Sequence, residues 1–144
     1  MQPETLTIQG ELREIERACS FAARFCHARG ISPVHARTLV LILEELITNT
    51  VKHGKLAAGS PITVTLQRSP AGIEIGYRDH GVPFDPNHDV PAPDFSLTLS
   101  RRPTGGLGWH LIKFYCSRLD YRREGSTNLL ALCVPLDRDG AAPR

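Results

Sequence analysis

The chain has 144 residues, of which 41% are hydrophobic and 22% are charged, as is usual for a globular protein. This length predicts one domain that can bury a core without disulfides or structural metals. Its 17 basic and 15 acidic residues give a net charge of +2. This is not the strong positive charge that would indicate nucleic-acid binding. No apolar run approaches the roughly 20 residues of a membrane helix, and the first residues lack the basic and apolar regions of a signal peptide. We expect one domain over residues 1–137 and a flexible tail over residues 138–144.

Four cysteines, Cys19, Cys26, Cys116 and Cys133, are spread along the chain. They form no C-x-x-C pair, and the neighbouring histidines do not complete a zinc pattern. Most lie in apolar stretches, so we interpret them as small buried side chains. Unpaired thiols fit a reducing compartment, and we therefore expect a cytoplasmic protein.

The N-terminal half predicts one strand and two helices. Residues 4–8 alternate between polar and apolar side chains, as in a short strand. Apolar residues then recur at helical spacing over 11–29. Ser32 and Pro33 form a helix start, with Ser32 at the N-cap and Pro33 at the first helical position. The helix expected over 33–53 is apolar on more than one side, which predicts that it is largely buried.

The C-terminal half predicts two hairpins separated by a loop and a helix. The expected elements are strands at 62–67 and 72–78, a proline-rich loop at 80–104, a helix at 108–117 and strands at 119–123 and 128–135. A loop of this length in a small domain is typical of a functional lid or a disordered segment. Antiparallel hairpins with helices grouped between them predict an α+β two-layer sandwich. We expect a mixed, mostly antiparallel sheet covered by helices on one face.

The first chemical motif lies within the 33–53 helix. Glu45 and Asn49 are four residues apart and therefore share a helix face, whereas Glu44 points about 100° away from Glu45. A carboxylate can orient or deprotonate a hydroxyl, and an amide oxygen is a hard ligand that suits Mg²⁺. Lys52 and His53, one turn further along, would reach the same phosphates. The alternative is a solvated stripe of charged side chains, which is common on helices.

The second motif follows the strand at 72–78. Asp79 could accept a hydrogen bond from the exocyclic amine of adenine, and Gly81 would let the ring approach the backbone. Guanine offers an acceptor oxygen at that place, so the carboxylate would favour adenine. The alternative is an ordinary turn, in which Asp and Gly are both common.

The third motif is Thr104-Gly105-Gly106-Leu107-Gly108, before an apolar helical segment. Glycines ahead of a helix let backbone N–H groups converge on an anion, and the helix dipole assists. The sequence lacks the Gly-Lys-Ser/Thr ending of a P-loop and the parallel βαβ unit of a dinucleotide fold. A flexible hinge is the alternative interpretation.

Taken together, the three motifs resemble the ATP-binding domain shared by gyrase B, Hsp90, MutL and sensor histidine kinases. The chain is most similar to the stand-alone anti-sigma-factor serine/threonine kinases of bacteria. The resemblance covers roughly residues 5–135, including the closing turn at 126–128, and implies the Bergerat-type ATP-binding fold. Trp109 and His110 are bulkier than the family pattern. The matching positions are Glu45, Asn49, Lys52, His53, Gly54, Asp79, Gly81, Phe84, Asp85, Gly106 and Gly108.

The resemblance implies a role for each matched position. Asn49 would coordinate Mg²⁺ between the ATP phosphates, and Glu45 would be the base or hydroxyl-orienting group. Asp79 would accept the adenine amine. Residues 85–104 would form a lid over the nucleotide. The remaining expected ATP-binding residues are Lys52, His53, Gly81, Phe84, Thr104, Gly105, Gly106, Leu107 and Gly108.

The implied function is an ATP-dependent protein serine/threonine kinase that acts as an anti-sigma or partner-switching regulator. It would phosphorylate a small antagonist protein, sequester a sigma factor and act as a homodimer, without direct contact with nucleic acid or membrane. The alternative is a catalytically silent ATP-binding module that only gates the binding of a protein partner.

Overall fold

The computed structural model describes residues 2–90 and 106–136 of the chain. The five strands form one sheet in the order β1-β2-β3-β5-β4, and every neighbouring pair is antiparallel. The expected α+β fold is confirmed, although the sheet, expected to be mixed, is wholly antiparallel in this part of the chain. The elements are β1 (Glu4–Gln9), η1 (Leu12–Glu14), α1 (Ile15–Ala28), α2 (Pro33–His53), β2 (Pro61–Ser69), β3 (Gly72–Asp79), α3 (Gly106–Tyr115), β4 (Arg118–Glu124) and β5 (Thr127–Val134).

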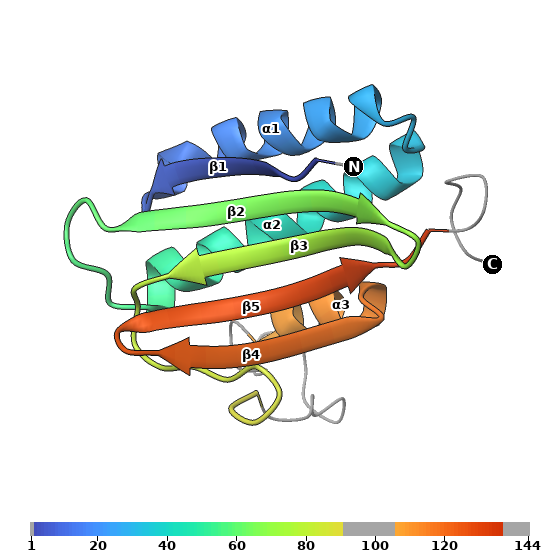
Figure 1. The fold of residues 1–144 in the computed structure, drawn as a ribbon. Coiled ribbons are helices and arrows are strands. Elements are labelled where there is room, and N and C mark those ends of the chain that lie inside the picture. Colours follow the sequence, from blue (N-terminus) through green and yellow to red (C-terminus); the bar gives the residue numbers. More distant parts are fainter. Residues whose placement is uncertain (1, 91–105, 137–144) are drawn as a thin grey trace.

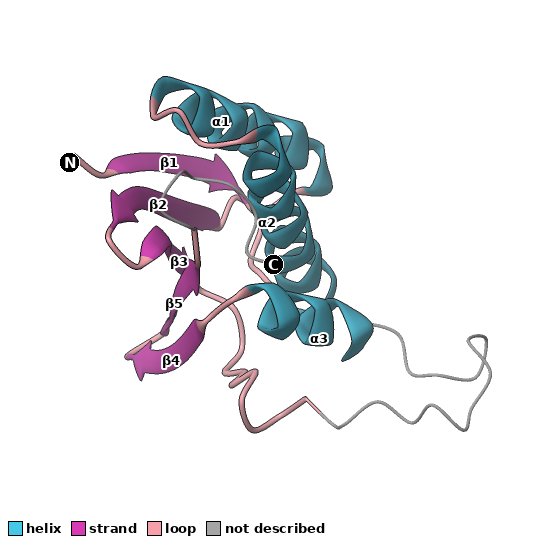
Figure 2. Ribbon diagram, turned by 90° about the vertical axis from the view of Figure 1, so that its right-hand side faces the viewer, coloured by secondary structure: helices cyan, strands magenta, loops and turns pink. Residues whose placement is uncertain are grey.

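The molecule has two layers, with the sheet on one side and the three α-helices on the other (Figures 1 and 2). Helix α2 runs behind the sheet, with α1 packed along one flank and α3 near its other end. The sheet therefore has one covered face and one open face. This arrangement places the residues of α2, α3 and the covered face of the sheet close to one another.

Helix α2 has the bounds that its sequence predicts. Ser32 has extended backbone angles and its hydroxyl accepts a hydrogen bond from the backbone N–H of His35, while Pro33 occupies the first turn. The helix packs against both α1 and α3. Its buried apolar side chains, which are at most 1% exposed, are Leu39, Ile42, Leu43, Leu46 and Ile47.

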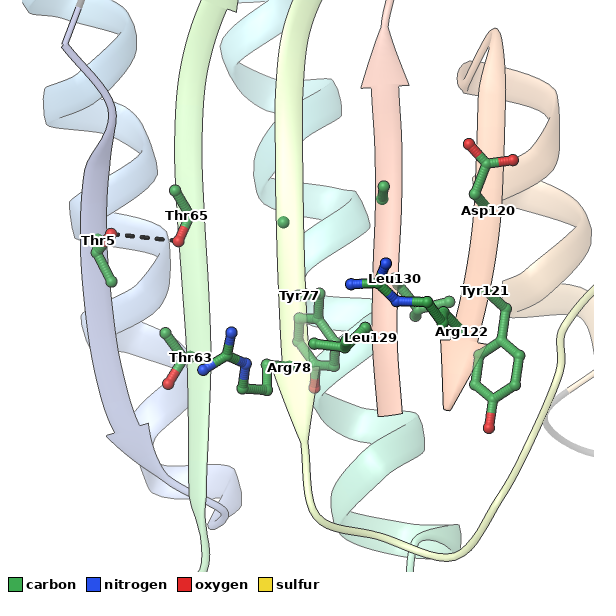
Figure 3. A pocket seen from close by; sticks show the side chains of 12 residues that line it. Thr5, Thr63, Thr65, Tyr77, Arg78, Asp120, Tyr121, Arg122, Leu129 and Leu130 are labelled. Carbon is green, nitrogen blue, oxygen red and sulfur yellow. Dashed lines mark hydrogen bonds between the residues drawn. The ribbon is translucent and has the colours of Figure 1, made fainter. Parts of the chain in front are cut away.

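Strand alternation separates the two faces of the sheet. In β2 the covered face carries Ile62, Val64 and Leu66, which are fully buried. The open face carries Thr63 and Thr65, whose hydroxyls bond to Thr7 and Thr5 across the β1–β2 pair at 3.3 and 3.2 Å. Figure 3 shows a shallow hollow on this open face, where Arg78 from β3 and Arg122 from β4 flank Leu129 of β5.

The strand bounds lie within two residues of the sequence prediction, and the two helices that flank α2 in the sequence begin at other residues than expected. The helix expected to begin at residue 11 starts with the 3-10 turn η1, in which the N–H of Ile15 bonds to the carbonyl of Leu12. Glu11 gives no side-chain cap, so an α-helical first turn is not favoured there. Helix α3 begins at Gly106 and ends at Tyr115, so it lies two residues before the expected range 108–117 at both ends.

Parts of two expected segments lie outside the described residues, namely 91–104 of the loop and lid, and the tail 138–144. Within residues 2–90 and 106–136, no helix combines the length and the apolar character needed to cross a membrane.

The core predicts the effect of truncating Leu43, which is fully buried on α2. Leu43→Ala should lower the free energy of unfolding by about 2–5 kcal/mol, because it leaves a cavity that the helix and sheet cannot close. Leu12→Ala is the matched control, since Leu12 is 46% exposed, and it should stay within about 0.5 kcal/mol of wild type. Urea denaturation measures both, and equal losses would contradict this description of the core.

Candidate functional site

The first and third motifs meet where α2 passes the start of α3. Gly108 faces Glu45 so closely that a Cβ placed on Gly108 would collide with the Glu45 carboxylate. The same Cβ would lie 3.6 Å from Nδ2 of Asn49. Both polar side chains of α2 therefore point toward the glycine-containing turn that opens α3. Only a residue without a side chain fits at position 108 with Glu45 in this conformation.

Asn49 has an unmet hydrogen-bonding capacity on this face. Its Nδ2 is buried and has no hydrogen-bond partner among the residues that the structure describes. Because the amide nitrogen and oxygen are assigned from their contacts, a rotated amide would present Oδ1 at the same point. An amide oxygen held there suits a hard cation that also binds phosphate oxygens, so the site fits Mg²⁺.

The other polar residues near this end of α2 differ in direction. Lys52 and His53 are exposed in its last turn, where they could approach a bound anion. Glu44 instead faces α1, where its Oε1 accepts a hydrogen bond from Cys19 Sγ at 3.7 Å. Burial and the neighbouring Glu44 raise the pKa of the Cys19 thiol to about 11. Glu44 is therefore separate from the Glu45–Asn49 face, as its position on the helix predicts.

The second motif lies at the end of β3, where Asp79 is only 6% exposed. Its Oδ1 accepts hydrogen bonds from the backbone N–H of Gly81 at 2.8 Å and from Nδ2 of Asn128 at 2.9 Å. Its Oδ2 lies 3.3 Å from the hydroxyl of Thr50, which comes from α2. The two N–H groups can only donate, so Oδ1 is an acceptor in both of these bonds.

A small buried network lies behind Asp79. The hydroxyls of Thr50 and Tyr77 are 2.7 Å apart, and both lie within hydrogen-bond distance of the Leu46 carbonyl, at 3.0 and 3.2 Å. Burial strongly raises the pKa of the Tyr77 phenol, so Tyr77 remains a donor. These contacts join β3 to α2 directly beneath Asp79.

Gly81 is buried against the end of α2. A Cβ on Gly81 would lie 2.9 Å from the carbonyl oxygen of Gly54, and Val82 donates its N–H to that oxygen at 2.9 Å. The segment after β3 is thereby fixed to the residue that ends α2. This contact brings the Asp79 motif next to the helix that carries Glu45 and Asn49.

Aromatic packing links the loop after β3 to α3. The rings of Phe84 and Trp109 stack with centroids 5.7 Å apart and planes at 27°. The bulk of Trp109, unexpected at that position, is accommodated by this stack and by burial to 7% exposure. Leu107 is 42% exposed, and the expected phosphate-loop residues Thr104 and Gly105 lie outside the described residues.

Sequence reasoning missed the residues that hold Asp79 in place. Asn128 lies directly opposite Asp79 in the β3–β5 pair and directly opposite Arg123 in the β4–β5 pair. Its Oδ1 accepts hydrogen bonds from Tyr121 at 2.6 Å and from Arg123 at 3.0 Å. The one sequence signal was the alternation of β4, which places Tyr121 and Arg123 on the same face.

Comparison with known proteins agrees with this fold. A model of the histidine kinase-like ATPase domain matches residues 8–134. The chain therefore belongs to the histidine kinase-like ATPase domain family, whose members share an ATP-binding fold. No curated protein matches the chain.

One solved structure with a similar fold is the crystal structure of the RsbU and RsbW domains of Rv1364c from Mycobacterium tuberculosis. It has a TM-score of 0.63 and 11% sequence identity, over 94% of this chain and 33% of that one. The chain thus spans about a third of the length of that protein. At this identity the similarity establishes the fold.

The contact between Gly108 and Glu45 can be tested with a double-mutant cycle. In a Glu45→Ala background, Gly108→Ala should stabilise the protein by up to about 1 kcal/mol, because alanine favours helix over glycine. With Glu45 present, the collision should cancel that gain. Urea denaturation of the four proteins gives the coupling, and an equal effect of Gly108→Ala in both backgrounds would contradict the contact.

Proposed function

We propose that this protein is an ATP-dependent serine/threonine protein kinase that acts as an anti-sigma or partner-switching regulator. The observation that carries the proposal is the convergence of Glu45 and Asn49 on Gly108, on the same helix whose Thr50 contacts the buried carboxylate of Asp79. Membership of the histidine kinase-like ATPase family supports ATP as the bound nucleotide. The geometry supports an arrangement in which the base lies at Asp79 and the phosphates lie between α2 and α3.

Recognition of adenine would rest on Asp79. An acceptor carboxylate would receive the exocyclic amine of adenine and would face the carbonyl oxygen of guanine unfavourably. Gly81 would lie under the ring, as the resemblance implies, and the close approach of Gly54 also requires a residue without a side chain there. Phe84, which is 37% exposed beside Trp109, would border the nucleotide on the loop side.

The phosphates would lie near Asn49 and the N-terminus of α3. Backbone N–H groups at Gly106, Leu107 and Gly108 are at the positive end of that helix. Lys52 and His53 would add positive charge from the last turn of α2, and the proposed phosphate-binding residues also include Thr104 and Gly105. Magnesium, when bound through Asn49, would neutralise phosphate charge.

Phosphoryl transfer would depend on position and charge more than on covalent chemistry. A serine or threonine hydroxyl of the partner would approach the γ-phosphate in line with the leaving oxygen. Glu45 would hold that hydroxyl and accept its proton as the new O–P bond forms and the bond to ADP breaks. Gly108 leaves room beside this carboxylate, which a side chain would remove.

The proposed phosphoacceptor is a small anti-sigma-factor antagonist, and a sigma factor is the proposed second partner. The proposal includes a homodimer in the cytoplasm, one domain over residues 1–137, and no direct binding of nucleic acid or membrane. These points rest on the resemblance of the three motifs to anti-sigma-factor kinases. The fold shared with a chain that includes an RsbW domain is consistent with them.

Glu45→Gln separates a kinase from a silent ATP-binding module. The substitution preserves size and hydrogen bonding but removes the proton acceptor, so transfer to a cognate antagonist should fall by roughly a hundredfold or more. ATP affinity, measured by isothermal titration, should remain within about threefold of wild type. Phosphate incorporation is followed with radiolabelled ATP. Undiminished transfer would remove Glu45 from the mechanism, and absence of transfer in wild type would favour the silent module.

Asn49→Ala tests the metal ligand. Affinity for ATP in the presence of Mg²⁺ should fall more than about tenfold, while affinity in EDTA should change little, because the lost group binds ATP through the cation. Circular dichroism establishes that the variant is folded. An unchanged affinity with Mg²⁺ would show that Asn49 is not the ligand.

A further inference from the structure

The carboxylate of Asp79 has two unequal oxygens. Oδ1 already receives two short hydrogen bonds, from the N–H of Gly81 at 2.8 Å and from Asn128 at 2.9 Å. Two donors fill the lone pairs of one carboxylate oxygen. Among residues 2–90 and 106–136, Oδ2 has only the Thr50 hydroxyl, at 3.3 Å, and that hydroxyl is closer to the Leu46 carbonyl. Oδ2 therefore retains the capacity to accept another hydrogen bond.

Asn128 determines which oxygen is filled, and chemistry fixes the orientation of its amide. Arg123 can only donate, so the Asn128 oxygen must face it. The amide nitrogen then faces Asp79 and the carbonyl of Val82, both at 2.9 Å, and these two acceptors use both of its hydrogens. A third acceptor, the carbonyl of Gly81, lies further away at 3.3 Å. If the amide were rotated, its oxygen would face the Asp79 carboxylate oxygen and its nitrogen would face the Arg123 guanidinium. Neither pair could form a hydrogen bond.

Two residues of β4 hold Asn128 in this orientation. The Tyr121 hydroxyl and the Arg123 guanidinium both donate to its oxygen, and Arg123 also donates to the carbonyl of Gly81 at 2.7 Å. Asp79, Asn128 and Arg123 lie in one row across β3, β5 and β4. The row runs along the covered face of the sheet, and hydrogen bonds to a charged donor are stronger than neutral ones.

We propose that Asn128, oriented by Arg123 and Tyr121, is a positioning residue that fills Asp79 Oδ1 and leaves Oδ2 as the acceptor for the 6-amino group of ATP. This inference rests on the proposed nucleotide site and extends it to base selection. Asn128 has no spare hydrogen for the base, so it acts through Asp79. The β4–β5 hairpin, which supplies neither Glu45 nor Asn49, thereby determines the preference for adenine.

The test compares ATP with purine riboside triphosphate, which lacks the 6-amino group. The ratio of their affinities, measured by titration with Mg²⁺, reports the contact of that amine alone. Wild type should favour ATP by roughly tenfold. In Asn128→Ala the ratio should fall by about fivefold, and in Arg123→Gln by about threefold, because Asp79 is then free to rotate. The shared ribose and phosphates make the ratio insensitive to losses elsewhere in the site.

Arg122→Gln is the matched control, since Arg122 is adjacent to Arg123 but lies on the open face and pairs with Glu124. It should leave the ratio of the two affinities unchanged.

Tyr121→Phe removes only a hydroxyl and gives a mild second variant if Asn128→Ala does not fold. Its ratio of affinities should fall about twofold. If folded Asn128→Ala or Arg123→Gln lost affinity for both nucleotides equally, the positioning role would be overturned. If wild type bound ATP and purine riboside triphosphate with equal affinity, the positioning role would be overturned but nucleotide binding would stand. If wild type bound neither nucleotide, the proposed function itself would be wrong.

Discussion

The packing of α2 against the sheet is the constraint on which the rest of the structure depends. Five apolar side chains of this helix are at most 1% exposed, so its rotation about its own axis is fixed by burial. Once that rotation is fixed, Glu45 and Asn49 lie on the helix face that meets α3, and Thr50 lies on the face that meets β3. The same free energy that stabilises the core therefore sets the geometry of the site.

Burial of polar groups imposes the second constraint. Asp79, Thr50 and Asn128 are each at most 8% exposed, and a buried polar group without partners is costly. The structure meets this requirement with hydrogen bonds from three elements, α2, β5 and β4. Such a network allows few arrangements, which keeps the Asp79 carboxylate in one orientation before any ligand binds. Stability and recognition thus rest on the same contacts.

The sequence predicted the fold well where the signals are local. Helical spacing and the Ser32–Pro33 start gave the bounds of α2, and period-two alternation placed β2 and β3 within two residues. The pairing of β3 with β5 could not be predicted in this way, because it joins residues about 50 to 60 positions apart. For the same reason the sequence placed Asn128 where the closing turn meets the last strand but could not show that it lies opposite Asp79. The stack of Phe84 on Trp109 was likewise invisible, since nothing local relates the two positions.

A crystal structure with Mg²⁺ and a non-hydrolysable ATP analogue would test the central claim most directly. The account predicts that the 6-amino group donates to Asp79 Oδ2 and that Asn49 reaches the cation between the phosphates. Gly108 should lie beside the phosphates, and Asn128 should keep its bonds to Asp79 and Arg123. A nucleotide on the open face of the sheet, between Arg78 and Arg122, would contradict it. A base at Asp79 that makes no amine contact with the carboxylate would equally contradict the assigned mode of recognition.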